Sequence, residues 1–396
     1  MLCFALAALV LLGTAAGEQA AVPDITNIKQ QPIPENEAMA FMKALGAGWN
    51  LGNTFEATKG DWNRNADEMT LETAWQKDVI QEPLFDFLKE AGIRTVRMPV
   101  SWHDHVAADG TISERWLSRV QQVVDWAMSK GLYVILNAHH DVDKKWYYPS
   151  EEYYANTEAY MKSIWTQLSE RFKDYDDHLI FEPINEPRQV GTDHEWGFSA
   201  GNPGCLEAAD CINRLNQLFV DIVRQSGGHN ADRYLMIPGY AHAVAPVLDD
   251  SFVLPTDSAD NRLIVTVHTY TPYDFALDIH SPVKSFDLQE QGKIQPIAQA
   301  MASLYKKYVV NGIPVVVGEF GCVNKNNLQD RVNYTAYAAV AAACRNIPVV
   351  WWDNNNYSGS GETFCIVDRK NYTARVPEIL EALLRYGGHD NVAPRE

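Results

Sequence analysis

The sequence lacks the features that mark several large classes of protein. Its 33 lysines and arginines are outnumbered by 51 aspartates and glutamates, which gives a formal charge of −18 at pH 7. A polyanion of this kind repels nucleic-acid phosphates and anionic membrane surfaces. Beyond the first residues, no apolar run reaches the ~20 residues that a membrane-spanning helix needs. The composition therefore predicts neither a nucleic-acid partner nor a membrane partner.

Cysteine is scarce, and its spacing matches no zinc-binding pattern. Cys3 falls in a segment that we expect to be removed, which leaves an odd number, so at least one thiol stays free or pairs between chains. Cys205 and Cys211 flank what reads as a short loop and are the disulfide expected in an oxidising compartment. The pairing of the other three stays open: Cys322, Cys344 and Cys365.

The chain divides into four predicted parts. Residues 1–17 are typical of a secretory signal, because an apolar stretch from Leu2 to Leu12 precedes small residues that suit signal peptidase, although a basic leading region is missing. Residues 18–35 carry three prolines and are expected to be irregular. Residues 36–388 are expected to form a single folded domain and 389–396 a short tail. We therefore expect a secreted, extracellular monomer.

Short apolar runs alternate with amphipathic stretches through the folded domain. Eight runs are predicted to be buried strands: 45–50, 95–99, 133–137, 179–183, 234–237, 263–267, 314–317 and 348–352. Helical patterns cover 75–91, 114–130, 152–172, 206–225, 294–310, 330–344 and 376–386. The alternation predicts an α/β fold, a (β/α)8 TIM barrel. An open doubly wound sheet is disfavoured because no Gly-rich phosphate loop follows an early strand.

Polar and aromatic side chains gather where these strands end. The carboxyl ends of barrel strands meet at one face, which is where barrel enzymes carry their active sites. Scattered turn residues would be the ordinary expectation, but seven strands end in groups suited to sugar chemistry. The residues concerned are Asn53, Arg97, His139, Asn185, Glu186, His268, Tyr270, Glu319 and Trp352.

Glu186 and Glu319 end two separate predicted strands. Glycoside hydrolysis needs one protonated carboxyl to protonate the leaving oxygen and one carboxylate to attack or to activate water. A surface ion pair is the ordinary interpretation of either glutamate alone. Together, at the ends of separate strands of one barrel, they predict a catalytic pair.

Seven motifs carry a resemblance to a known family. They are GWNLGNT at 48–54, RMP at 97–99, NAHH at 137–140, LIFEPINEP at 179–187, VHTY at 267–270, VGEFG at 317–321 and WWDN at 351–354. In this order they resemble glycoside hydrolase family 5, and within it the subfamily 4 cellulases. The resemblance implies a retaining endo-β-1,4-glucanase that needs no cofactor, with Glu186 as acid/base, Glu319 as nucleophile and Asn185 in contact with the β-glucan substrate.

The supporting residues follow from charge and strand geometry. Arg97 is expected to lower the pKa of Glu319, while a less solvated Glu186 is expected to stay protonated. His268 and Tyr270 are two positions apart on a strand and so point the same way. Trp352 is expected to form the floor of the −1 sugar subsite. The resemblance makes His139 a site residue and His140 a less secure one.

Two further interpretations concern metals and the outer subsites. His139, His140 and His268 raise the possibility of a metal centre, but adjacent strand residues face opposite sides, so we expect none. Trp146 and Trp196 are the preferred sugar-stacking residues of the outer loops. Asn53 and Glu56 follow the first strand, where related enzymes contact sugars on the nonreducing side. Xyloglucan, lichenan, xylan or mannan stay open as substrates, and a noncatalytic carbohydrate-binding barrel is the remote alternative.

Overall fold

The structure is a computed structural model that describes residues 20–60 and 67–388. The signal predicted at residues 1–17 and the tail predicted at residues 389–396 lie outside the described residues. None of the described helices combines the length and the apolarity that crossing a membrane would require.

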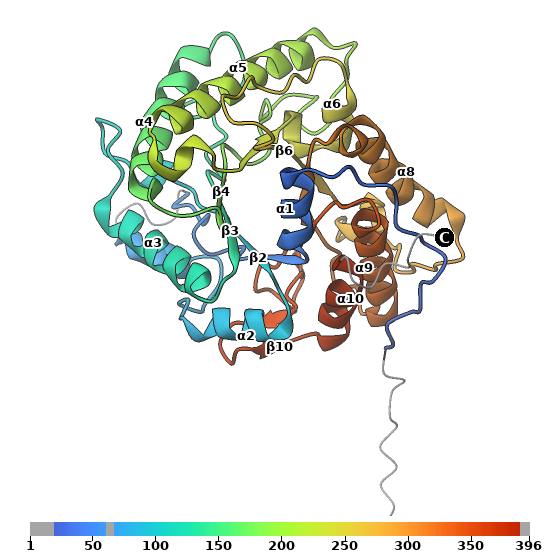
Figure 1. The fold of residues 1–396 in the computed structure, drawn as a ribbon. Coiled ribbons are helices and arrows are strands. Elements are labelled where there is room, and N and C mark those ends of the chain that lie inside the picture. The colour runs from blue at the N-terminus through green and yellow to red at the C-terminus, as the bar shows by residue number, and fades with distance from the viewer. Residues whose placement is uncertain (1–19, 61–66, 389–396) are drawn as a thin grey trace, which may run out of the picture.

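Eight parallel strands form a closed barrel in the order β1 to β8, which confirms the predicted fold (Figure 1). The strands are β1 Gly48–Asn50, β2 Thr95–Met98, β3 Tyr133–Asn137, β4 Leu179–Glu182, β5 Leu235–Pro238, β6 Leu263–Thr269, β7 Val315–Phe320 and β8 Val349–Trp351. Nearly every residue of these strands is buried, as expected for strands covered by side chains inside and by helices outside. A separate two-stranded sheet joins β9 Val367–Asp368 to β10 Thr373–Ala374.

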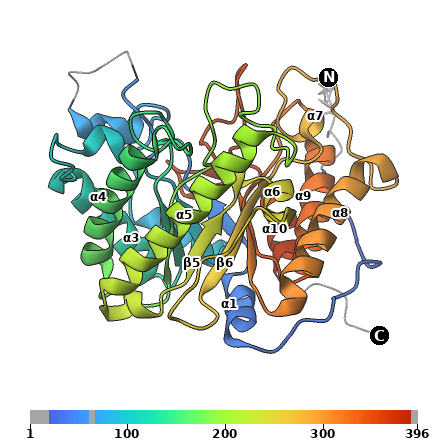
Figure 2. The same ribbon diagram turned by 90° about the horizontal axis from the view of Figure 1, so that it is seen from above.

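Helices surround the barrel and also close one of its ends. They are α1 Glu37–Leu45, α2 Pro83–Ala91, α3 Glu114–Ser129, α4 Tyr154–Phe172, α5 Pro203–Gln225, α6 Val244–Leu248, α7 Tyr273–Ala276, α8 Gln291–Lys307, α9 Leu328–Ala343 and α10 Pro377–Gly387. Figures 1 and 2 show α1 across the end of the barrel where the strands begin. There Phe41 stacks on Tyr234, just before β5, with ring centres 3.7 Å apart. The opposite end, where the strands finish, is left for long loops (Figure 2).

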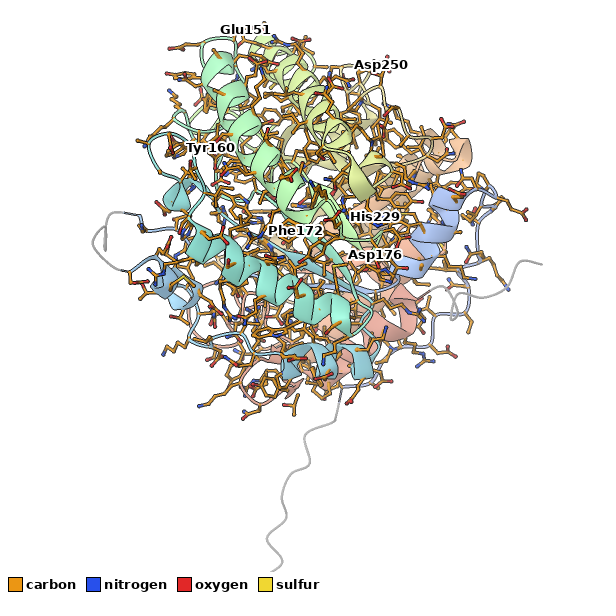
Figure 3. All side chains as sticks on the ribbon, turned by 60° about the vertical axis from the view of Figure 1, so that its left-hand side comes forward. Glu151, Tyr160, Phe172, Asp176, His229 and Asp250 are labelled. Atoms are coloured by element: carbon orange, nitrogen blue, oxygen red, sulfur yellow. The ribbon has the colours of Figure 1, made fainter. Side chains whose placement is uncertain are left out.

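The helices pack on the barrel through large buried side chains. Trp165 of α4 lies 5.3 Å from the ring of Phe181 in β4 and 4.6 Å from that of Phe219 in α5. One tryptophan therefore joins a strand to two neighbouring helices, which lie side by side on the outside of the barrel (Figure 3). Burial of a side chain of this size is a main source of stability for such a fold.

The helix predicted to begin at Trp75 begins only at Pro83, as α2. Proline suits the first turn of a helix because its missing N–H has no partner there in any case. Residues 75–82 instead form bends, irregular chain and a turn that follow a short 3₁₀ helix, Glu68–Thr73. Trp75 is therefore a loop residue, and 40% of its surface is exposed.

The predicted disulfide between Cys205 and Cys211 is wrong. Both residues lie within α5, at positions i and i+6. A helix rises ~1.5 Å per residue, which separates the two Cα atoms by about 9 Å, beyond the reach of a disulfide. The cysteines of the described ranges are all buried free thiols.

Candidate active site

Two carboxyl groups face each other at the end of the barrel where the strands finish. Glu186 follows β4, Glu319 lies in β7, and a carboxyl oxygen of each lies within 4.8 Å of the other and of His268. Retaining glycosidases hold their two carboxyls ~5–5.5 Å apart, whereas inverting enzymes leave ~6.5–9.5 Å for a water. The spacing fits attack by one carboxylate, as in the retaining class.

A bulge in the barrel directs Glu319 toward its partner. The pairing of β6 with β7 shifts register after Val267, so that His268 lies opposite Glu319 and Gly318 is the extra residue. A Cβ on Gly318 would lie 3.2 Å from Thr266 Oγ1 and 3.3 Å from His268 Nε2, tighter than ordinary contact. Glycine allows this close approach, and bulges of this kind re-aim side chains next to active sites.

Arg97 is the central cation of the site. It is fully buried in β2 and donates from Nη1 to Glu319 Oε1 at 2.7 Å. Its Nε and Nη2 donate to Glu182 Oε2 at 2.9 and 2.7 Å, and Nη2 also reaches Asn185 Oδ1 at 2.7 Å. One guanidinium therefore fixes the carboxylate of Glu319 and the amide of Asn185 relative to each other.

The pKa of Glu319 is raised, whereas Arg97 was expected to lower it. Burial is the largest influence and raises the pKa of Glu319 to about 8, and the charge of Glu186 raises it further, while Arg97 and Tyr270 lower it. Arg97 thus acts in the predicted direction, but desolvation outweighs it. Desolvation therefore opposes the negative charge on Glu319 that its hydrogen bonds with Arg97 and Tyr270 favour.

His268 and Tyr270 lie on the same side of the β6 segment, as their spacing predicts. Tyr270 donates from its hydroxyl to Glu319 Oε2 at 3.0 Å. His268 Nδ1 lies 3.0 Å from Glu186 Oε1 and 3.6 Å from Glu319 Oε2. Burial lowers the pKa of His268 well below its usual range, so its ring is neutral and can exchange a hydrogen bond with either carboxyl.

A stack of flat groups forms the wall beside the carboxyls. The ring of His139 is parallel to that of Trp352, with centres 5.8 Å apart. Trp352 lies against Gly52, where a Cβ would meet the indole at 3.0 Å and the carbonyl oxygen of Asp353 at 2.7 Å. Glycine at position 52 therefore makes room for the tryptophan, which keeps 9% of its surface accessible.

Of the two residues after β1 that were expected to contact sugar, Asn53 is partly accessible and Glu56 is not. Glu56 is fully buried, so the expectation that it contacts sugar directly is wrong. Its carboxylate accepts the backbone N–H groups of Asn53 and Thr54 instead. Burial raises the pKa of Glu56 to about 7. Glu56 thus holds the turn in which Asn53, with a left-handed φ of 57°, stays partly accessible.

The outer aromatic and histidine residues lie in different settings. His140 is exposed and packs against Trp75, with ring centres 5.4 Å apart. Trp146 is partly buried, with Lys145 Nζ 4.1 Å from its ring centre. Trp196 is 60% exposed, and the guanidinium of Arg188 covers one of its faces at 3.9 Å. The other face of Trp196 is therefore open.

Sequence reasoning missed Arg188 and Trp75. Arg188 donates from Nη1 to the carbonyl oxygen of Glu186 at 3.0 Å and so joins Trp196 to the acid/base candidate. Trp75 falls in the helical pattern predicted over 75–91, because its apolar neighbours suggest helical periodicity. Arg188 could have been suspected from its place directly after the motif that ends at Pro187.

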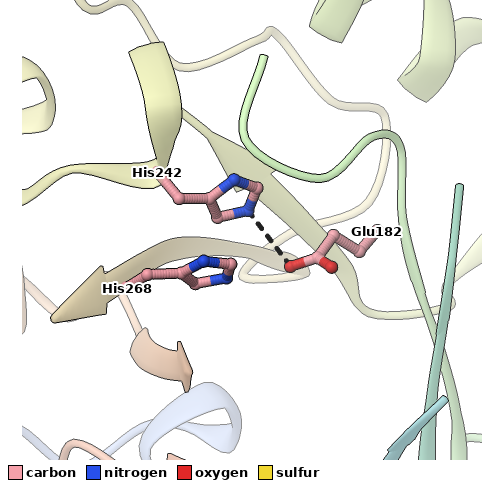
Figure 4. A group of neighbouring side chains, drawn as sticks. All are labelled: Glu182, His242 and His268. Atoms are coloured by element: carbon pink, nitrogen blue, oxygen red, sulfur yellow. Dashed lines mark hydrogen bonds and ion pairs between the residues drawn. The ribbon is translucent and has the colours of Figure 1, made fainter. Parts of the chain in front are cut away.

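Three groups of side chains in the described ranges have the composition of a metal site. The first is Glu182 with His242 and His268 (Figure 4), and the others are Glu186 with His268 and Glu319, and Asp176 with Asp177 and His178. In the first group, His242 Nδ1 accepts the backbone N–H of Glu186 at 2.8 Å. The hydrogen of the neutral ring is therefore on Nε2, which points to Glu182 Oε1 at 3.3 Å. A ring nitrogen that carries a hydrogen cannot ligate a metal, so the donor chemistry does not fit an ion there.

The fold and the opposed carboxyls define a TIM-barrel glycoside hydrolase. Residues 59–358 match the family model described as cellulase, glycosyl hydrolase family 5. The chain belongs to this family. It is 36% identical over 368 residues to Endoglucanase A of Clostridium longisporum, which covers 93% of this chain and 69% of that protein.

Solved structures agree with this assignment. A glycoside hydrolase 5 lichenase from Caldicellulosiruptor sp. F32, solved as a mutant with cellotetraose, superposes with a TM-score of 0.91 and 47% identity, over 93% of this chain and all of that one. A GH5-4 broad specificity endoglucanase from Ruminococcus champanellensis, with bound cellotriose, gives a TM-score of 0.82 and 40% identity, over 89% and 100% of the two chains. The expected resemblance to family 5, and to its subfamily 4, is confirmed.

Proposed function

We propose that this protein is an endo-acting β-1,4-glucanase that works with retention, with Glu319 as nucleophile and Glu186 as acid/base. The observation that carries the proposal is the approach of the two carboxyls to within 4.8 Å, with Arg97 bound to Glu319, the nucleophile candidate of the two. The family membership and the cello-oligosaccharides bound by the similar structures support β-glucan as the substrate.

The first half of the reaction forms a glycosyl-enzyme. Oε2 or Oε1 of Glu319 attacks the anomeric carbon while Glu186 gives its proton to the leaving oxygen. Arg97 and Tyr270 both donate to Glu319, which favours the carboxylate form of Glu319. That form is the productive one, since a protonated Glu319 could not attack.

The second half releases the sugar with its original configuration. Glu186, now a carboxylate, removes a proton from water, and the resulting hydroxide displaces Glu319 from the anomeric carbon. His268 Nδ1, 3.0 Å from Glu186 Oε1, keeps the side chain in place in both protonation states because a neutral imidazole nitrogen can donate or accept. Every step uses groups of the chain and water.

The sugar is held by the flat wall and by the outer aromatics. Trp352, parallel to His139, offers the floor of the −1 subsite, and Asn185 is oriented by Arg97 to meet a hydroxyl of the same sugar. Trp196, reached from Glu186 through Arg188, is suited to the leaving-group side, and Trp75 beside His140 to another sugar. Each stacking contact is expected to contribute ~0.5–1.5 kcal/mol beyond area burial.

A panel of pure polysaccharides tests which polymer is cleaved. We expect rapid release of reducing ends from soluble β-1,4 and mixed-linkage glucans, with E319Q as the inactive control. Fast cleavage of xyloglucan, xylan or mannan with little action on glucan would move the substrate to one of the other polymers. Binding to these glycans without any turnover would favour a noncatalytic barrel and would overturn the proposal.

Secretion and a monomeric state complete the proposal. The apolar segment at residues 2–12, followed by small residues, supports export. A neutral polysaccharide outside the cell would not be repelled by a chain of charge −18. Mass spectrometry of the protein recovered from the medium should give an amino terminus near residue 18. An intact first residue on cell-retained protein would contradict export.

A further inference from the structure

His242 is a buried side chain that the mechanism above does not use. It lies in the loop after β5 and is wholly shielded from solvent, and Figure 4 shows its contact with Glu182. Its Nδ1 accepts the backbone N–H of Glu186 at 2.8 Å, and its Nε2 points to Glu182 Oε1 at 3.3 Å. Because a backbone N–H can only donate, the tautomer of His242 is fixed by its contact with Glu186.

The backbone of Glu186 needs such a partner. Its φ of 44° lies in the left-handed region, which residues with a Cβ rarely adopt. The facing residues Ala241 and His242 are also left-handed, with φ of 51° and 52°. Ala241 donates its N–H to Pro187 O at 2.8 Å, so the two strained turns are joined by hydrogen bonds on either side of Glu186.

His242 also contacts the imidazole that faces the carboxyl of Glu186. Its ring stacks on that of His268 with centres 4.2 Å apart and an angle of 22°. His268 Nδ1 is in turn 3.0 Å from Glu186 Oε1. His242 therefore contacts the main chain of Glu186 directly. It reaches the carboxyl of Glu186 through the ring of His268. Glu182 anchors the arrangement, since Arg97 and Thr266 Oγ1 also bind its carboxylate.

We propose that His242 is a positioning residue for the acid/base: through Nδ1 it holds Glu186 in the strained conformation from which the carboxyl can protonate a leaving group. The proposal rests on the proposed role of Glu186. It predicts that loss of the Nδ1 acceptor harms proton donation specifically, because the nucleophile and its ligand Arg97 do not depend on this contact.

Two near-isosteric variants separate the roles of the two ring nitrogens of His242. In His242→Asn the amide oxygen stands close to the position of Nδ1 and keeps an acceptor for the Glu186 N–H. In His242→Gln the amide stands close to Nε2, reaches toward Glu182 and leaves that N–H without its acceptor. Both variants lose the ring stacking on His268, so a purely structural role would affect them alike.

The readout is kcat/KM for substrates that differ only in their need for an acid. Hydrolysis of 2,4-dinitrophenyl β-cellobioside needs no proton donor, whereas cleavage of cellotetraose does. We expect H242Q to lose on the order of 10- to 100-fold on cellotetraose, with less than about a threefold change on the dinitrophenyl substrate. H242N should stay within about threefold of the parent on both substrates.

A matched control and the parent acid variant make the outcomes distinct. His105 is also buried, stacked on Trp116 at 3.8 Å and remote from the carboxyls, so H105N and H105Q should show no dependence on leaving group. Equal losses of H242N and H242Q on both substrates would overturn the positioning role. If E186Q itself cleaved cellotetraose at the parental rate, the proposed function would fail instead.

Discussion

Arg97 donates to Glu319 and Glu182 at once, at 2.7 Å to an oxygen of each, and is closed off from solvent. The guanidinium thus lies between the nucleophile candidate and a second carboxylate that cannot contact substrate. Burial opposes ionisation of Glu182, but Arg97 and His242 lower its pKa well below the usual range. Glu182 therefore stays anionic and keeps Arg97 in place, which leaves the position of Glu319 defined before substrate arrives.

Replacement of this cation should affect both stability and chemistry. For Arg97→Met we expect roughly 3–5 kcal/mol less free energy of unfolding, because Glu182 is left as an unpaired buried charge. We also expect kcat/KM to fall on the order of 10²–10³-fold, on acid-independent as well as acid-dependent substrates. Denaturant titration and kinetics on 2,4-dinitrophenyl β-cellobioside measure the two effects.

A surface arginine is the control for that experiment. Arg385 forms an exposed ion pair with Asp24 at 3.7 Å, and R385M should change neither quantity appreciably. A stable R97M variant with parental kinetics would show that Arg97 does not hold the nucleophile.

The effect of Glu186 on the pKa of Glu319 gives a pH prediction with a definite sign. Glu186 is one of the groups that raise the pKa of Glu319 to about 8, while Arg97 and Tyr270 lower it. E186Q removes that negative charge, so the pKa of Glu319 should fall and the carboxylate should form at lower pH. The acidic limb of kcat/KM for 2,4-dinitrophenyl β-cellobioside should move to lower pH in E186Q. A limb that moves to higher pH would mean that the two carboxyls are not coupled in this way.

The exposed indole of Trp196 should act on binding and leave stability unchanged. W196A is expected to raise KM for cello-oligosaccharides roughly 2- to 12-fold, the equivalent of one stacking contact. The unfolding temperature should hardly change because 60% of the side chain is exposed. Val253, 58% exposed on the connection to β6, gives the control V253A, which should leave KM unaltered. An unchanged KM in W196A would remove this residue from the sugar-binding surface.

The close contact at Gly52 predicts a backbone effect on the −1 wall. A Cβ there would lie 2.7 Å from Asp353 O and 3.0 Å from the indole of Trp352, so Gly52→Ala must displace one of them. We expect about 1–3 kcal/mol less stability and a clear loss of kcat/KM. Gly292 in α8 has open space around a built Cβ, and G292A should be neutral or slightly stabilising. Parental activity in G52A would show that Trp352 can shift without consequence.

Much of the fold could be predicted from the sequence because each barrel strand is a local run of apolar residues. Strands such as β3 and β7 are continuous apolar runs, and every predicted run became a strand of the barrel. The beginning of α2 was misplaced because Trp75 and its apolar neighbours imitate helical spacing, while Pro83 at the first helical position decides the true start. The helix predicted over 206–225 already includes Cys211, which is incompatible with a loop between the two cysteines, and α5 begins still earlier, at Pro203.

The site was predictable where function rests on residue type and less so where it rests on packing. Glu186, Glu319 and Arg97 were identifiable from their strand ends, and the structure brings them together. The burial of Glu56 depends on how the turn at Asn53 closes, which no local pattern records. The role of His242 is a contact between two loops that lie 56 positions apart in the chain.

Azide rescue tests the division of labour between the carboxyls most directly. With 2,4-dinitrophenyl β-cellobioside, Glu319→Gly should accept azide in place of the nucleophile and give α-cellobiosyl azide. Glu186→Ala should form the glycosyl-enzyme and give the β-azide, since azide then attacks without needing a base. Nuclear magnetic resonance of the anomeric proton distinguishes the two products. The opposite pairing of variant and product would contradict the account.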